Sequence, residues 1–305
     1  MKKLSIITPF YERQNLVIPF LEEYAEVAKK ITDSFEIIIV DDSPNYDLFE
    51  YIKNIKNKYP FLRVIKLSKN WGQHPAILAG LKSARGELIV VTDCGMRESP
   101  DNIIKFHQKM VDENLDLVIG RKKIYSAPLI KKLCSRGFWK VFNFFTNLNY
   151  DNNQVSQRLF NKKILNALLQ FEDVNLFWGG LFLEVGFRRG YIDVDYKYDE
   201  KVKTSYNFLR SIELASTFLT SFSEAPLRIS SAFSLVLFIF SIFTIIYIVY
   251  MKVTHGYQSG FASTICIILF CSSIQLLVVG ILGEYLAKNN SQTRKRPRYF
   301  IDEEI

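Results

Sequence analysis

Acidic and aromatic residues follow directly after several short apolar segments, and their types suit the binding of a polar ligand. Pro9-Phe10-Tyr11-Glu12 follows the first segment, Asp41-Asp42 the second and Asp93 the fourth. A carboxylate can accept hydrogen bonds from a base or a ribose, or hold a divalent cation beside a diphosphate. Each acid alone is also a common solvated or helix-capping residue. Acids after three separate segments favour a nucleotide site.

The apolar segments predict the strands that position these acids. The segments are rich in Ile, Val and Leu, are mostly continuous rather than alternating, and cover residues 4–8, 36–40, 62–67, 87–92 and 115–119. Such segments are typical of parallel strands that are covered on both faces. Segments with helical spacing separate them, at residues 16–30, 48–58, 75–84 and 100–113. This alternation predicts a doubly wound α/β domain, in which ligands bind beyond the carboxyl ends of the strands.

Two long apolar stretches near the C-terminus predict membrane spans. Residues 229–251 and 261–283 are each 23 residues long, or about 34 Å of helix, which is enough to cross a bilayer core. Arg228 precedes the first stretch, and a basic cluster at 288–298 follows the second. Because basic flanks stay in the cytoplasm, both termini are expected there, with the short 252–260 loop on the other side.

A third helix is expected just before the first span. Apolar residues from Phe208 to Phe222 recur at spacings of four and three, which predicts one apolar helix face. This helix either lies in the membrane interface or packs on the α/β domain, and its sequence fits both. The expected organisation is a cytoplasmic nucleotide-sugar-binding catalytic domain (1–205), a juxtamembrane amphipathic helix (206–228), two transmembrane helices (229–251 and 261–283) and a basic cytoplasmic tail (284–305).

Composition narrows the classes of ligand. The 305 residues include 39 Lys and Arg and 31 Asp and Glu, which gives a net charge of +8. Much of this excess lies beside the apolar stretches, so anionic lipid and a phosphorylated substrate are better candidates than nucleic acid. The chain contains neither a P-loop nor a glycine-rich dinucleotide fingerprint, which argues against ATP hydrolysis and hydride transfer.

Seven motifs spread over nearly the whole chain carry a family resemblance. They are ITPFYERQN (7–15), IIIVDDSP (37–44), LSKNWGQHPAILAG (67–80), VTDCGMRESPD (91–101), SFSEAPLRI (221–229), LGEYLAK (282–288) and RPRYFI (296–301). With these motifs the chain resembles the family 2 glycosyltransferases of the polyprenyl-phosphate type. That group contains dolichyl-phosphate mannose synthase and the bacterial 4-amino-4-deoxy-arabinose transferase that uses undecaprenyl phosphate.

The resemblance implies a fold, a reaction and partners. The fold would be a GT-A-like, mostly parallel sheet with helices on both faces, plus an interfacial amphipathic helix and two C-terminal transmembrane helices. The reaction would be the inverting transfer of a sugar from a nucleotide-sugar donor, expected to be a UDP-sugar, to polyprenyl (undecaprenyl) phosphate. It would take place on the cytoplasmic leaflet of a bacterial inner (plasma) membrane, for cell-envelope glycan or lipid modification. Relatives associate through their membrane segments, which implies a homo-oligomer, by resemblance a tetramer.

The resemblance also implies roles for individual residues. Asp41 would lie nearest the base and ribose, and Asp93 would match the first acid of the family's Asp-x-Asp motif, which binds Mg²⁺ or Mn²⁺. The other residues expected to line the nucleotide pocket are Pro9, Tyr11, Glu12 and Asp42. Basic residues in positions like those of the family, expected to bind the acceptor phosphate or the leaving diphosphate, are Arg121, Arg136, Arg158 and Lys203. Each of these four cations could otherwise be a solvated surface charge.

The metal motif departs from the family pattern. The usual Asp-x-Asp-x-Gln reads Asp93-Cys94-Gly95-Met96-Arg97, so the second acid and the glutamine are replaced. One carboxylate and the substrate phosphates can still hold Mg²⁺, because this ion keeps several waters. Alternatively, Arg97 neutralises the leaving diphosphate in place of a metal ion.

A second departure concerns the general base. Ser156 stands two residues before Arg158, where the family commonly has an acid, and a serine cannot act as a carboxylate base. His74 is either a substitute base or a structural histidine at a helix start. These departures leave a second function open, a catalytically impaired nucleotide-binding membrane scaffold of the same fold.

Overall fold

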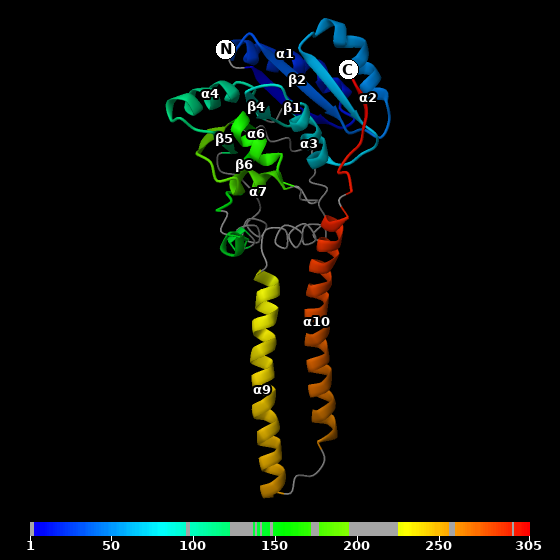
Figure 1. Ribbon diagram of the computed structural model, residues 1–305, viewed down its shortest axis with the longest axis vertical. Helices are drawn as coiled ribbons and strands as arrows, with labels where there is room; N and C mark the ends of the chain where they lie inside the picture. Colours follow the sequence, from blue (N-terminus) through cyan, green and yellow to red (C-terminus); the bar gives the residue numbers. More distant parts are fainter. Residues whose placement is uncertain are drawn as a thin grey trace. The chain divides into compact units, whose positions relative to one another are not determined.

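The computed structural model comprises two compact units (Figure 1). It describes residues 3–95, 98–122, 137, 139–140, 142–146, 149–171, 177–194, 225–255, 260–294 and 296–305. The first unit contains a sheet with its covering helices and also residues 296–305, whereas the second contains the two long C-terminal helices.

Within the described residues, one eight-stranded sheet organises the first unit, in the order β7-β5-β6-β4-β1-β2-β3-β8. The strands are β1 (Leu4–Phe10), β2 (Phe35–Asp41), β3 (Leu62–Leu67), β4 (Leu88–Val91), β5 (Leu117–Lys122), β6 (Gln154–Asn161), β7 (Arg189–Val194) and β8 (Ile301–Glu304). Strand β1 pairs in parallel with β2 and β4, as do β2 with β3 and β5 with β7. Strand β6 is antiparallel to β4 and β5, and β8 is antiparallel to β3. The prediction of a mostly parallel α/β sheet is confirmed.

The five predicted strands are present, and three further strands were not predicted. The strand β6 reads QVSQRLFN and has polar side chains on both of its faces. A hydrophobic pattern cannot reveal such a strand, because its burial depends on neighbours that are distant in sequence. It inserts between β4 and β5, so the C-terminal half of the α/β domain is built around an antiparallel strand.

Helices cover both faces of the sheet, as predicted. On one face, the buried apolar side chains of α1 (Val17–Ile31), α2 (Asp47–Ile55) and α4 (Asn102–Asp112) join Ile6 and Ile39 in a single core. On the other face, α3 (Gln73–Ser83) packs against Ile7 and Val40. The remaining short helices of this unit are η1 (Gln14–Leu16), η2 (Lys56–Lys58), α6 (Lys162–Leu168) and α7 (Trp178–Glu184).

A glycine sets how closely α3 approaches the sheet. A Cβ at Gly80 would clash with Ile7 Cγ2 and would lie 3.3 Å from Val40 Cγ2. Packed interiors have little free volume to absorb such an atom. The close approach matters because the segment just before α3 lies at the sheet edge where β1, β2 and β4 end, each followed by acidic residues.

The C-terminus returns to the sheet instead of ending as a free tail. Strand β8 pairs with the edge strand β3, and Val64 and Ile305 exchange two backbone hydrogen bonds of 2.9 and 3.0 Å. Arg63 donates to Glu304 Oε1 at 2.6 Å. The last residues of the expected basic tail (284–305) thus form an edge strand, which covers backbone groups of β3 that would otherwise be unpaired.

The described part of the second unit contains two long helices, α9 (Ala225–His255) and α10 (Phe261–Thr293). By length and composition, one helix among the described residues is apolar enough to cross a membrane, α10 over Phe270–Ala287. The span expected at 229–251 lies in α9, which is a continuous helix there, and it stays a prediction. The expected amphipathic helix at 206–228 lies outside the described residues except for its last four positions, which begin α9.

Replacing Gly80 with alanine is expected to lower the free energy of unfolding by about 1–3 kcal/mol, because the added methyl group must push α3 away from Ile7. Urea denaturation of the full chain in detergent measures the effect. The matched control is Gly137→Ala, since a Cβ at Gly137 meets nothing within 4 Å. Equal stability of the two variants would contradict the close packing of α3.

Candidate active site

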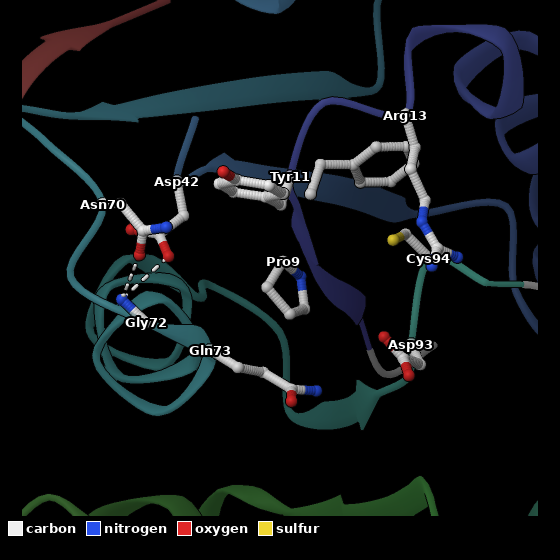
Figure 2. A pocket seen from close by; sticks show the side chains of 10 residues that line it. Pro9, Tyr11, Arg13, Asp42, Asn70, Gly72, Gln73, Asp93 and Cys94 are labelled. Atoms are coloured by element: carbon white, nitrogen blue, oxygen red, sulfur yellow. Dashed lines mark hydrogen bonds between the residues drawn. The ribbon is translucent and has the colours of Figure 1, made fainter. Parts of the chain in front are cut away.

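A cavity of about 300 Å³ lies at the carboxyl ends of β1, β2 and β4. This edge is where open α/β sheets bind ligands. Its wall comes from four separate segments, namely the end of β1, the residue after β2, the segment leading into α3 and the residues after β4 (Figure 2). The lining residues are Pro9, Phe10, Tyr11, Arg13, Asp42, Asn70, Gly72, Gln73, Asp93 and Cys94.

The Asp42 carboxylate holds one wall of the cavity together. Its Oδ1 accepts from the backbone N–H of Trp71 at 2.7 Å, and its Oδ2 accepts from that of Gly72 at 2.9 Å. Gly72 has φ of +92°, a conformation that a side chain disfavours. Burial raises the pKa of Asp42, and the two N–H donors oppose this rise by stabilising the charged form. The carboxylate therefore shapes the segment that begins α3.

Its neighbour Asp41 is not among the residues that line the cavity. Asp41 is fully buried, accepts from the Ser43 N–H at 2.8 Å and has Lys66 Nζ 3.6 Å from its Oδ2. Burial raises the pKa of Asp41 despite these partners. Of the two neighbouring acids, Asp42 is the one that lines the cavity, and the role expected for Asp41 near the base and ribose stays a prediction.

The residues that end β1 divide between the cavity wall and the surface. Pro9 and Tyr11 line the cavity, and the Tyr11 ring is 46% exposed (Figure 2). Glu12 is exposed, is not part of the wall and has a φ of +50°. Its backbone N–H donates to Ser43 Oγ at 3.0 Å, which ties the end of β1 to the end of β2. Glu12 therefore turns the chain, while Tyr11 presents an aromatic face to the cavity.

Asp93 lies on the opposite side of the cavity from Asp42 (Figure 2). The preceding residue, Thr92, donates its N–H to the Ile7 carbonyl at 3.1 Å, and its hydroxyl lies 2.9 Å from the buried Tyr24 hydroxyl. These contacts fix the end of β4 and so the start of the Asp93 segment. Next to it, burial raises the pKa of the Cys94 thiol to about 12, which keeps the thiol neutral and unreactive.

Two of the predicted cations are described, and they differ in their surroundings. Arg158 is 6% exposed, and its guanidinium lies 4.8 Å from the centre of the Phe182 ring. Arg121 is half-exposed and donates from Nε to Asp193 at 2.7 Å. Arg158 is therefore a buried cation on β6, whereas Arg121 forms a surface ion pair away from the cavity wall. Arg97, Arg136 and Lys203 lie outside the described residues.

The cavity wall also contains residues that the sequence did not single out. Arg13, Asn70, Gln73 and Cys94 all line it. They lie inside the quoted motifs, so motif membership was the available signal, but nothing in their types marked them. Arg13 is the most informative, because Figure 2 shows its guanidinium on the same side as Asp93 and Cys94. A cation there can neutralise a bound anion.

The described residues offer a divalent cation a partial site. Asp93 is half-buried in the cavity wall. Among the described residues, no group of three or more His, Cys, Asp and Glu side chains could hold an ion. Because Mg²⁺ keeps several waters and uses one or two carboxylates with substrate phosphates, one carboxylate fits an ion that a diphosphate helps to hold.

Comparison with known proteins assigns the class. Residues 5–169 match Glycosyl transferase family 2, and this match covers more than half of the chain. The chain belongs to that family, and it is a glycosyltransferase. The resemblance that the motifs indicated is thereby confirmed.

Relatives match over nearly their full length. The undecaprenyl-phosphate 4-deoxy-4-formamido-L-arabinose transferase of Photorhabdus laumondii is 25% identical, over 100% of this chain and 95% of the relative. A prophage bactoprenol glucosyl transferase homolog of Escherichia coli is 26% identical, over 98% of both chains. An uncharacterized glycosyltransferase of Synechocystis is 25% identical, over 99% of this chain and 95% of the relative.

Replacing Asp42 with alanine is expected to free the segment that begins α3. The part-buried N–H of Trp71 loses its acceptor and that of Gly72 keeps only Asn70 Oδ1 at 3.0 Å, which costs about 1–2 kcal/mol. Hydrogen exchange at these two amides should accelerate by about tenfold or more. The control is Asp33→Ala at an exposed position. Unchanged exchange at Trp71 and Gly72 would contradict a role for Asp42 in shaping the wall.

Proposed function

We propose that this glycosyltransferase moves a sugar from a nucleotide sugar, namely a UDP-sugar, to a polyprenyl phosphate such as undecaprenyl phosphate. The observation that carries the proposal is the cavity at the carboxyl ends of β1, β2 and β4, with aromatic, acidic and basic residues in one wall. Family membership and the names of the two polyprenyl-linked relatives support it. The product would serve cell-envelope glycan or lipid modification.

The donor would lie across the cavity with its base near Tyr11 and its diphosphate near Arg13 and Asp93. The half-exposed Tyr11 ring offers a base an apolar surface. The Asp42 carboxylate already accepts hydrogen bonds from the Trp71 and Gly72 amides. Its role would therefore be to shape the part of the wall against which the base and ribose lie. Asp41 and Glu12 would support this arrangement indirectly, because both form hydrogen bonds with Ser43 at the end of β2.

Asp93 would hold Mg²⁺ or Mn²⁺ together with the donor diphosphate, and the ion would neutralise charge on the leaving group. Arg13 adds a fixed cation on the same side of the cavity (Figure 2). The proposal assigns Arg97 to the same task, in support of the ion or in its place. With Asp93 as the only wall carboxylate assigned to the ion, the ion and the donor would each bind weakly alone and more tightly together.

The chemistry proposed is an inverting displacement. An acceptor phosphate oxygen forms a bond to the anomeric carbon, while the bond from that carbon to the diphosphate oxygen breaks and its electrons leave with the diphosphate. A phosphate monoester has a second pKa of about 6, so at neutral pH it is largely ionised. A strong base is therefore less necessary than for a hydroxyl acceptor, which fits a serine at position 156. Arg158, together with Arg121, Arg136 and Lys203, would supply positive charge to the phosphates.

The second unit would bring the chain to its lipid acceptor. Large apolar side chains are exposed along both of its helices, among them Phe240 and Phe243 on α9 and Phe270 and Leu276 on α10. Exposed apolar surface of this extent is stable in lipid and costly in water. We therefore propose that α9 and α10 both span a bacterial plasma membrane, with both termini in the cytoplasm, and that copies of the chain associate there.

Membranes that contain the full chain should form a labelled lipid from undecaprenyl phosphate and one member of a panel of labelled sugar nucleotides. Asp93→Ala is expected to lower the rate by about 100-fold, because the leaving diphosphate loses its anchored counter-charge. The exposed Asp33→Ala is the control. Nucleotide binding without product from any donor would instead identify a non-catalytic scaffold.

Chelation distinguishes a metal ion from a fixed guanidinium as the counter-charge. EDTA is expected to abolish transfer, and added Mg²⁺ or Mn²⁺ to restore it, because one protein carboxylate cannot retain the ion against a chelator. The variant Arg13→Ala should then need more metal ion for half-maximal rate. Full activity in EDTA, lost on substitution of Arg97 or Arg13, would overturn the metal assignment.

A further inference from the structure

Four buried side chains on neighbouring elements have polar atoms without a partner in the described part of the chain. The atoms are His74 Nδ1, Glu98 Oε2, both amide atoms of Gln154 and Arg158 Nε. Buried polar groups are nearly always hydrogen-bonded, so each exception needs an explanation. None of the four residues lines the cavity that was assigned to the nucleotide.

Strand geometry gathers these groups beside one another. Gln154 and Arg158 pair with Arg121 and Ile119 of β5, which are two residues apart and so share a face, and Ser156 lies between them on β6. Glu98 joins the same face, because its Oε1 accepts from Ser156 N at 3.3 Å and from Ser156 Oγ at 3.0 Å. The charge of Arg158 acts on His74, and Glu98 and Arg158 also interact electrostatically. The four side chains therefore lie around one stretch of β6, and they are named the β6 cluster hereafter.

The opposite face of the same strand shows that β6 can satisfy buried polar groups internally. Gln157 is fully buried; its Nε2 donates to the Ser99 carbonyl at 3.3 Å, and its Oε1 accepts from Asn102 at 3.1 Å. Within β6, the unpartnered atoms thus lie on one face, which also carries the Arg158 contact with Phe182. An internal ligand on that face explains the difference.

The cluster borders the proposed donor site. In the pairing of β4 with β6, Val91 lies opposite Arg158. Asp93 follows Val91 by two residues and lines the cavity. A donor whose diphosphate lies at Asp93 would therefore place its sugar next to the exit of β4, on the side of β6.

The chemistry of the cluster matches hydroxyl groups better than phosphate. Glu98 Oε2 can only accept when ionised, Arg158 Nε can only donate, and Gln154 offers one acceptor and two donor hydrogens. Burial, followed by the charge of Arg158, lowers the pKa of His74 to about 4, so its imidazole is neutral and offers one donor and one acceptor. A phosphate needs donors alone and is repelled by a carboxylate, whereas each sugar hydroxyl both donates and accepts.

We propose that Glu98, Gln154 and His74, with the Nε edge of Arg158, form the subsite that binds the hydroxyl groups of the transferred sugar. This inference rests on the proposed glycosyl transfer and adds the specificity site to it. A sugar that lacks a contacted hydroxyl leaves a buried carboxylate or amide unpaired, and sites of this kind discriminate strongly against such analogues. The donor would therefore be a hydroxyl-rich, uncharged sugar.

The test compares nucleotide sugars with free nucleotides on the full chain in lipid nanodiscs. Calorimetry gives dissociation constants for UDP, GDP, UDP-glucose, UDP-galactose, UDP-N-acetylglucosamine and GDP-mannose. The sugar gain is defined as the dissociation constant of the free nucleotide divided by that of the nucleotide sugar. In Glu98→Gln, an amide nitrogen replaces the accepting Oε2. The sugar gain of the best donor is expected to fall about tenfold in this variant and in Gln154→Leu, while free-nucleotide binding stays within twofold.

The exposed Glu50→Gln is the matched control and should change neither quantity. A sugar gain that survives both substitutions, or no gain for any sugar in the unmodified chain, would overturn the subsite. Loss of free-nucleotide binding in both variants would also overturn it, since these side chains would then be part of the framework. A separate measurement of lipid-linked product distinguishes failure of the subsite from failure of the proposed transfer. If product forms but the variants leave the sugar gain unchanged, the subsite alone is rejected. If no donor yields product, the proposed transfer is rejected.

Discussion

The cavity depends on two buried carboxylates at the end of β2. Burying a carboxylate is costly unless charge-assisted hydrogen bonds compensate, and here each acid has its own set of partners. Asp42 uses the N–H groups of Trp71 and Gly72, which forces the chain into the turn that starts α3. Asp41 uses Ser43 and Lys66, which locks the strand end from below. Without these bonds, the three strand ends would still meet at one sheet edge, but the wall between them would have no defined shape.

Residues from the far end of the chain also support that wall. The Trp71 ring lies 5.7 Å from that of Phe300, just before β8, and Ser68 donates its N–H to the Phe300 carbonyl at 3.0 Å. Strand β8 then pairs with β3, the strand that leads into the same segment. The last residues of the chain thus protect an exposed sheet edge and brace the loop that carries Asn70 and Gly72. The C-terminus is therefore part of the catalytic unit as well as an extension of α10.

The site separates two tasks between the two parts of the sheet. The parallel strands β1, β2 and β4 present the cavity in which Tyr11, Arg13 and Asp93 face a nucleotide diphosphate in the proposed function. The antiparallel strand β6 presents the cluster around Arg158, which has the mixed donors and acceptors that a sugar requires. A phosphate acceptor requires nearby positive charge more than it requires a general base. A serine at position 156, beside the buried carboxylate of Glu98, is consistent with such an acceptor.

The amino-acid sequence alone determined the five apolar strands, the helices between them, the family and the three acidic strand ends, because continuous apolar segments and motif residues are local signals. It could not predict β6, whose polar side chains are buried through contacts with α4, α7 and the Glu98 segment. It also could not distinguish Asp41 from Asp42, since neighbours in a strand point to opposite sides and only the packing decides which side is the cavity. The same reason hid Arg13 and Gln154. Tertiary structure decided these roles because burial, hydrogen-bond partners and charge neighbours are properties of the folded chain.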